Sequence, residues 1–127
     1  MTPKHLLPAL LMLGACASAQ AELVKVFENI RGTVVYADSS TLSENGDLRR
    51  IVEIQSYREP GPRGMLSMKL LKEYNCSKET TQIISYSMYS ERMAKGSLIG
   101  QVNSPGPVDK LTKNPGGAGG WRYACGK

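Results

Sequence analysis

Two cysteines that lie far apart in the sequence, Cys76 and Cys125, constrain the fold of this chain more than any other feature. The third cysteine, Cys16, lies in a segment typical of export signals. Disulfides persist outside the cytoplasm, and two cysteines there most simply form one bridge. Two free, buried thiols are the alternative. A bridge between positions 49 residues apart would add roughly 4 kcal/mol to the free energy of unfolding, because it restricts the unfolded chain.

The N-terminus has the three parts of a secretory signal peptide in the expected order. Lys4 and His5 give a charged start, residues 6–15 form an apolar run, and residues 15–21 offer small-residue cleavage sites after Ala19 or Ala21. We therefore predict a signal peptide at 1–21 and one domain at 22–127. A buried N-terminal helix is the alternative. The apolar run is shorter than the roughly 20 residues that span a bilayer, so no integral membrane span is expected.

The segment from Leu13 to Cys16 also resembles a bacterial lipobox, in which Cys16 would be lipidated and become the new N-terminus. Lipoproteins usually continue with a polar tether, whereas a strand-like run begins here at Leu23. We therefore favour a soluble product over a lipid-anchored one. The predicted location is the periplasm, or the outer membrane and cell surface if the protein is displayed or anchored there.

Short runs of β-branched and aromatic residues, separated by turn residues, predict a mostly β domain. Asn45-Gly46 indicates a tight turn within a polar stretch from Asp38 to Asp47. The short connections favour an antiparallel meander. Residues 104–120 are rich in Pro and Gly and are expected to form a loop. The six expected strands are residues 23–28, 33–37, 48–57, 65–76, 80–89 and 97–102.

Few groups in the sequence could carry catalysis. His5 leaves with the signal, so the mature chain has no histidine to act as a base or as a zinc ligand. Carboxylates such as Glu53 have no distinctive spacing, and we expect them at the surface. The glycine-rich residues 115–120 lack the Lys-Ser/Thr pair of a phosphate-binding loop. The sequence therefore predicts no enzyme, no cofactor and no metal site.

Positive charge is concentrated in the last third of the chain. Residues 22–91 carry 9 basic and 10 acidic groups, whereas residues 92–127 carry 6 basic groups and only Asp109. Such a surface attracts acidic proteins or polyanionic glycans, although an ordinary solvated surface is the simpler interpretation. Export argues against a nucleic-acid partner. The candidate partner-binding residues are Lys95, Lys110, Lys113, Arg122 and Lys127.

Five motifs in order resemble those of the surface-adhesin protein E domain family of Gram-negative bacteria, over residues 24–127. They are Tyr36-Ala37-Asp38, Gly46 to Ile54, Glu73-Tyr74-Asn75-Cys76, Tyr89-Ser90 with Met93 to Gly96, and Pro115-Gly116 with Trp121 to Cys125. The resemblance implies an α+β fold that is mostly β. In it, a curved antiparallel sheet of about six strands carries a short C-terminal helix, tied to its concave side by the disulfide.

That helix would begin near Gly117, where this sequence has three glycines in four positions. Each glycine costs about 1 kcal/mol inside a helix, so we expect only one or two turns before Cys125.

The resemblance also implies adhesion, which in this family is the binding of host matrix and serum proteins at the bacterial surface. The first hypothesis is therefore an exported, non-enzymatic binding module that holds a host-matrix, glycan or envelope partner. The second is a periplasmic structural protein that maintains the envelope and acts through self-association. An exposed edge strand favours such pairing, and because family members form dimers, a homodimer is expected under this hypothesis.

Overall fold

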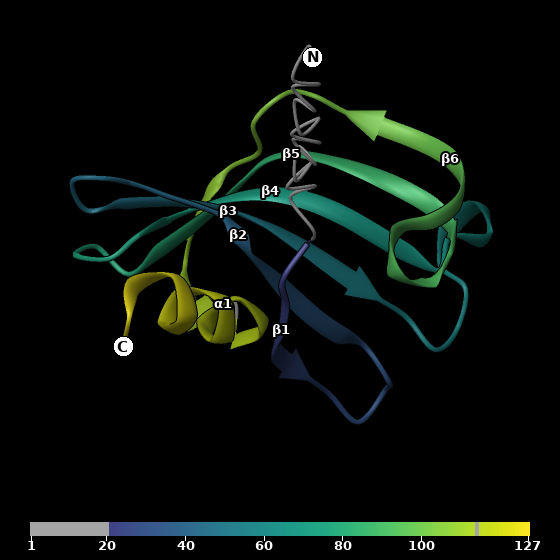
Figure 1. The fold of residues 1–127 in the computed structure, drawn as a ribbon, viewed down its shortest axis with the longest axis horizontal. Coiled ribbons are helices and arrows are strands. Elements are labelled where there is room, and N and C mark those ends of the chain that lie inside the picture. Colours follow the sequence, from purple (N-terminus) through teal and green to yellow (C-terminus); the bar gives the residue numbers. More distant parts are fainter. Residues whose placement is uncertain (1–20, 114) are drawn as a thin grey trace, which may run out of the picture.

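A single antiparallel sheet makes up most of the protein in the computed structural model, which describes residues 21–113 and 115–127. The sheet curls over one side, and the C-terminal helix lies beneath the curl (Figure 1). The predicted signal peptide and Cys16 lie, apart from Ala21, outside the described residues. The strands follow one another in space as in sequence: β1 (Leu23–Glu28), β2 (Val34–Asn45), β3 (Leu48–Ser56), β4 (Ser67–Asn75), β5 (Thr80–Glu91) and β6 (Lys95–Val102).

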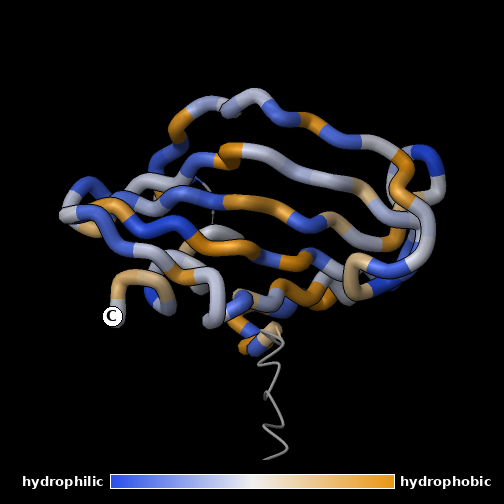
Figure 2. Tube along the Cα trace, turned by 45° about the horizontal axis from the view of Figure 1, so that its top comes forward, coloured by the Kyte–Doolittle hydropathy of each residue, from blue (hydrophilic) through white to orange (hydrophobic). Residues whose placement is uncertain are grey.

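The predicted six-stranded antiparallel meander is confirmed, with most strand ends within two residues of those expected. Apolar and polar residues are interspersed along the strands (Figure 2). Asn45 pairs with Leu48, so the β2–β3 turn is only two residues long and Gly46 takes a φ of 59°. The tight turn predicted at Asn45-Gly46 is therefore present.

Most of the polar stretch at residues 38–47 belongs to a strand, because the second strand, expected to end at residue 37, continues as β2 to Asn45. The pairing of β2 with β3 is irregular between Asp38 and Ser43. Asp38 Oδ1 accepts hydrogen bonds from the Ser40 amide and hydroxyl at 3.1 and 2.6 Å. Thr41 Oγ1 accepts one from the Val52 amide at 2.9 Å. These side chains replace the missing ladder bonds, so a polar stretch can remain in the sheet.

The loop expected at residues 104–120 is only partly present. Residues 108–110 form a short strand, β7 (Val108–Lys110), which pairs with the start of β5. A helix then begins at Pro115. Three single 3-10 turns complete the elements: η1 (Pro62–Gly64), η2 (Arg92–Ala94) and η3 (Leu111–Lys113).

Helix α1 (Pro115–Cys125) has 11 residues, about three turns, so the expected one or two turns are too few. It packs against β1, β3 and β4. A Cβ atom at Gly119 would overlap the Val26 carbonyl oxygen, and one at Gly120 would overlap the Tyr74 hydroxyl and Glu53 Oε2. The glycines therefore let the helix backbone approach the sheet closely, and this packing offsets their low helix propensity.

The predicted disulfide is present and joins the helix to the sheet. Cys76 directly follows β4 and Cys125 is the last residue of α1, with their Cα atoms 5.7 Å apart. Between the helix and the sheet lies the core cluster of Ala37, Ile51, Tyr74 and Ala124, each no more than 3% exposed. Trp121 packs against this cluster and donates from Nε1 to the Asn75 carbonyl at 2.9 Å.

Replacing Gly119 or Gly120 with alanine should lower the free energy of unfolding by about 1–3 kcal/mol, because the added methyl group overpacks the contact between helix and sheet. Helix propensity alone predicts the opposite, a gain of about 1 kcal/mol. Urea unfolding of each variant measures the sign. Gly106→Ala is the control, since its Cβ would lie at an ordinary 3.7 Å from the Ile83 carbonyl oxygen. A stabilised Gly119→Ala would contradict the close packing.

Candidate functional site

Four of the five predicted binding residues lie at the end of the molecule that carries the helix. Lys110 ends β7, Lys113 ends η3, Arg122 lies on α1 and Lys127 follows it. The Lys127 amide donates to the Arg122 carbonyl at 2.9 Å, which holds the last residue against the helix. All four side chains are exposed. We call this set the helix-end surface.

Lys95 does not belong to the helix-end surface. It pairs with Glu91 at the last residue of β5, whereas Lys110 pairs with Thr80 at the first. At about 3.3 Å per residue, roughly 35 Å of strand separates the two positions. Glu91 also places a negative charge directly across from Lys95. The structure therefore separates Lys95 from the other four cations.

Acidic groups near the helix-end surface are few. The Leu111 amide donates to the Glu79 carbonyl at 3.1 Å, which ties this end to the β4–β5 turn. That turn adds one exposed cation, Lys78, and one exposed carboxylate, Glu79, so the two charges offset each other. Asp109 on β7 is another carboxylate near this end, and so is exposed Asp47, whose carbonyl accepts from the Cys76 amide at 2.8 Å. The local excess of positive charge predicted from the sequence is thus retained.

A second polar feature, a buried cluster beneath α1, was not expected. Glu53 on β3 is 1% exposed, and Lys72 and Tyr74 on β4 are 5% and 0% exposed. Lys72 pairs across the strands with Ile51, and Leu70 pairs with Glu53. Because the two pairs are two residues apart on each strand, all four side chains point to the same face of the sheet. The Tyr74 hydroxyl donates a short hydrogen bond to Glu53 Oε2. Lys72 Nζ lies 3.7 Å from Glu53 Oε1 and 5.0 Å from the Tyr74 ring centre.

The expectation that the carboxylates lie at the surface is therefore wrong for Glu53, which is buried. A weak signal for this cluster was present in the sequence. Lys72 and Tyr74 continue the two-residue spacing of Leu66, Met68 and Leu70, so they share the apolar face of their strand. Glu53 likewise shares its phase with Ile51. Sequence spacing alone did not show which face of either strand is the inner one.

The electrostatics of the cluster favour a protonated Glu53. Burial raises the pKa of the Glu53 carboxyl, and this outweighs the opposing effects of the Lys72 ammonium and the Tyr74 hydroxyl. Burial also raises the pKa of Tyr74, and the neighbouring Glu53 raises it further, so the phenol stays protonated and donates. The positive charge of Lys72 thus faces a carboxyl group that resists ionisation.

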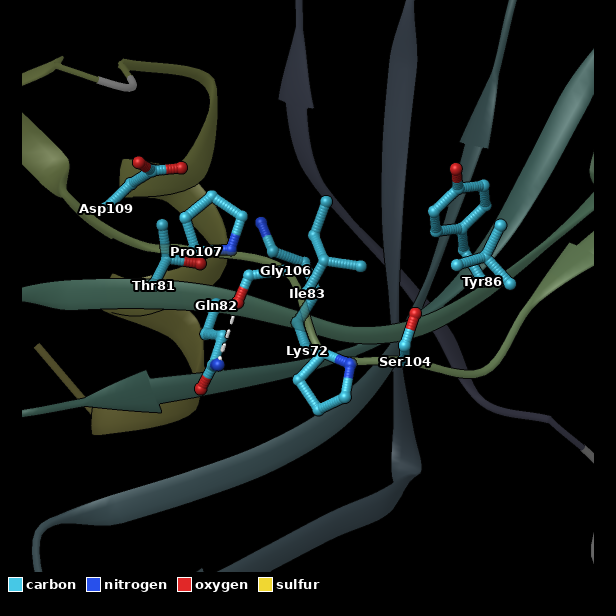
Figure 3. Close-up of a pocket in the computed structure, with 11 residues that line it drawn as sticks. Lys72, Thr81, Gln82, Ile83, Tyr86, Ser104, Gly106, Pro107 and Asp109 are labelled. Carbon is cyan, nitrogen blue, oxygen red and sulfur yellow. Dashed lines mark hydrogen bonds between the residues drawn. The ribbon is translucent and has the colours of Figure 1, made fainter.

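A cavity of about 340 Å³ adjoins this cluster on the same face of the sheet. It lies between β5 and residues 103–107, and we call it the β5 cleft. Figure 3 shows Tyr86 and Ser104 toward one end of the cleft, with Thr81 and Asp109 toward the other. Lys72 lines it from the neighbouring strand. Its apolar lining comes from Ile83, Tyr86, Val102, Pro105 and Pro107.

The outer wall of the β5 cleft is fastened to the sheet by two hydrogen bonds. The Gly106 amide donates to the Ile83 carbonyl at 2.9 Å, and Gln82 Nε2 donates to the Gly106 carbonyl at 2.9 Å (Figure 3). Pro105 and Pro107 flank this point and restrict the backbone further. The cleft is therefore preformed, as small-molecule sites usually are.

The raised pKa of Glu53 makes stability depend on pH with a definite sign. The folded state binds the Glu53 proton more tightly than the unfolded chain, whose carboxyl titrates near 4.5. The part of the free energy of unfolding that comes from this tighter proton binding is therefore fully present below that pH. It is lost as the pH rises through the higher pKa that Glu53 has in the folded state. Relative to Glu53→Gln, the wild type should become less stable over this window in urea unfolding measured at successive pH values.

Exposed Glu59 supplies the control for this measurement, since Glu59→Gln removes one surface carboxylate without touching the cluster. The prediction fails if the difference in free energy of unfolding between the wild type and Glu53→Gln stays constant with pH, or grows in favour of the wild type. Either result would show that Glu53 is ionised without cost.

Comparison with known proteins agrees with this fold. The sequence profile of the family described as Surface-adhesin protein E matches residues 23–126. The fold is similar to that of Haemophilus influenzae protein E in its crystal form II, with a TM-score of 0.63. The two share 14% sequence identity over 84% of this chain and 89% of that chain, so this likeness concerns the fold. No curated protein matches the sequence. Within residues 21–113 and 115–127, no helix combines the length and apolar character needed to cross a membrane.

Proposed function

The chain belongs to the Surface-adhesin protein E family, and from this premise we propose that it is an exported, non-enzymatic binding module. Its partner is an acidic protein or a polyanionic glycan, held at the helix-end surface. Membership of a family of surface adhesins supports an adhesin-like role and a location outside the cytoplasm. The single observation that carries the choice of partner is the grouping of four exposed cations around the disulfide-tied helix.

The helix-end surface suits a partner with extended negative charge. Its four cations come from three successive elements and the C-terminal residue, so they form a broad surface rather than a pocket. Exposed charges of this kind mainly raise the rate of encounter and make binding sensitive to salt. The disulfide and the close packing of α1 hold Arg122 and Lys127 on a rigid base, which lowers the entropy lost on binding.

Removing the four charges should weaken binding to heparin, a polyanionic glycan, and to polyglutamate, an acidic polypeptide. The variant replaces Lys110, Lys113, Arg122 and Lys127 with glutamine. Surface-immobilised heparin and polyglutamate measure the affinity at low and high salt. We expect a loss of about tenfold or more at low salt and a weaker salt dependence, because fewer ions are released on binding. The stronger of the two probes identifies the class of acidic partner.

A charge-matched control separates a local surface from a general effect of net charge. Arg31, Arg63, Lys69 and Lys95 are exposed cations from elsewhere on the sheet and its turns. Replacing these four with glutamine changes the net charge by the same amount but leaves the helix-end surface intact. Equal losses in the two variants, or wild-type binding by the first, would refute the proposed surface. Lys95→Gln alone tests whether that residue contributes after all.

Self-association in the periplasm is the second candidate function, and the outer strands of the sheet favour it. Leu23 and Val24 on β1 are 37% and 39% exposed, and Leu98 on β6 is 55% exposed. Apolar residues on unpaired edges can pair with a second copy of the chain. This candidate predicts a homodimer and needs no display at the cell surface.

Protease treatment of intact cells distinguishes the two candidates, combined with the mass of the purified native protein. For the adhesin, we expect loss of the protein from intact cells, because the partner-binding domain must be accessible. A signal peptide at 1–21 predicts the mass of a chain that begins at Glu22, or at Gln20 if cleavage follows Ala19. A mass that corresponds to a lipid-modified Cys16 would indicate the anchored form. Protection on intact cells and digestion only after the outer membrane is opened would contradict surface display and favour the periplasmic candidate.

A further inference from the structure

Lys72 is a buried ammonium group that lines a preformed cleft and lacks a full set of partners. Glu53 is its one carboxylate neighbour within 4 Å among the described residues. The 3.7 Å separation of Nζ from Oε1 exceeds that of a good hydrogen bond. Glu53 Oε2 is already occupied by the Tyr74 hydroxyl. An ammonium group has three hydrogens to donate, and a buried charge is costly until it is paired and hydrogen-bonded.

A second unsatisfied group lines the same cleft. Thr81 is 3% exposed, and its Oγ1 has no hydrogen-bond partner among the described residues. The Tyr74 hydroxyl donates to Glu53, and its oxygen lies toward Thr81. Thr81 pairs across the strands with Tyr74, next to the pair formed by Lys72 and Ile83. Both groups line the β5 cleft, where a bound molecule can supply a further hydrogen-bond partner to each.

The rest of the cleft limits what that molecule can be. The aromatic, branched and proline side chains of Tyr86, Ile83, Val102, Pro105 and Pro107 suit an apolar chain. A volume of about 340 Å³ is at the small end of the range for ligand sites. Among the described residues, Lys72 is the one cation that lines the cleft. Exposed Asp109 lines it as well, so a ligand with several negative charges is disfavoured.

We propose that the β5 cleft binds a small monocarboxylate with an apolar chain. The carboxylate accepts hydrogen bonds from the Lys72 ammonium and the Thr81 hydroxyl, and the chain lies against the apolar wall. This site contains none of the four cations of the helix-end surface, although Asp109 of the cleft directly precedes Lys110 on β7. The inference rests on the cleft alone and does not depend on the adhesin-like function.

Sodium octanoate, titrated into the nitrogen-15-labelled protein and followed by two-dimensional NMR, tests this proposal. We expect saturable shifts of the Thr81, Ile83 and Gly106 amide signals, weaker binding of 1-octanol and no binding of octylamine. The variant Lys72→Met/Glu53→Gln removes both charges together, so no buried charge is left unpaired. It should bind octanoate about tenfold more weakly or worse, which is the factor expected when a charged hydrogen bond is lost. Its affinity for octanol should stay close to that of the wild type.

A matched variant removes the same two charges away from the cleft. Lys69 is exposed on the opposite face of β4, and Glu59 is exposed in the loop after β3, so Lys69→Met/Glu59→Gln should bind octanoate like the wild type. Octanoate shifts that miss the cleft, equal binding of octanoate and octylamine, or full affinity in Lys72→Met/Glu53→Gln would overturn the proposal.

A third variant keeps the test decisive if the buried substitutions prevent folding. Ser104 is exposed and lines the cleft, so Ser104→Trp should block the site without disturbing the core and abolish binding of octanoate and octanol together. Heparin binding should be unchanged in this variant, since the helix-end surface is untouched. Wild-type octanoate binding by Ser104→Trp would place the ligand elsewhere and refute the site.

Discussion

The close contact between α1 and the sheet is the interaction on which the rest of this structure depends. Gly119 and Gly120 bring the helix backbone against the Val26 carbonyl and the Tyr74 hydroxyl, with no side chain between them. A lone helix of this composition would be unstable in water, because glycine has the highest conformational entropy to lose. The disulfide at Cys125 keeps the helix near the sheet, and the packing then makes it ordered.

This contact also creates the polar environment beneath the helix. Once α1 covers Tyr74 and Glu53, water no longer solvates their oxygens, and the two groups must satisfy each other. Lys72, on the same strand as Tyr74 and 3.7 Å from Glu53, is a buried cation beside them. Burial then raises the pKa of Glu53, which weakens the ion pair that would otherwise neutralise Lys72. The pairing of Glu53 with Tyr74, beside the β5 cleft, is thus a consequence of how closely the helix packs.

Two sets of positive charge in this protein have different physical properties. The cations of the helix-end surface are exposed and screened by salt, so they suit long-range attraction of an extended acidic partner. Lys72 is in a low-dielectric environment, where a single charge interacts strongly but only at short range. The first set favours recognition of a macromolecule by its charge, and the second favours a small molecule of defined shape.

The amino-acid sequence by itself determined the six strands of the meander, though not the full length of β2, together with their antiparallel order and the disulfide pair. These features follow from local signals: runs of β-branched and aromatic residues, the turn residues between them and the presence of two cysteines in the expected mature chain. The family was identified by the resemblance of five motifs in order. It also located the excess of positive charge. The length of α1 was underestimated, because glycine propensities describe an isolated helix and omit the sheet that packs against it.

Only the tertiary structure decided which face of each strand is inside, and hence that Glu53, Lys72 and Tyr74 meet under the helix. It also decided that Lys95 stands apart from the other cations, and that residues 103–107 enclose a cleft with β5. All of these depend on pairing register and on contacts between residues distant in the sequence. Local patterns leave such contacts undecided, since the same spacing is compatible with either face being buried.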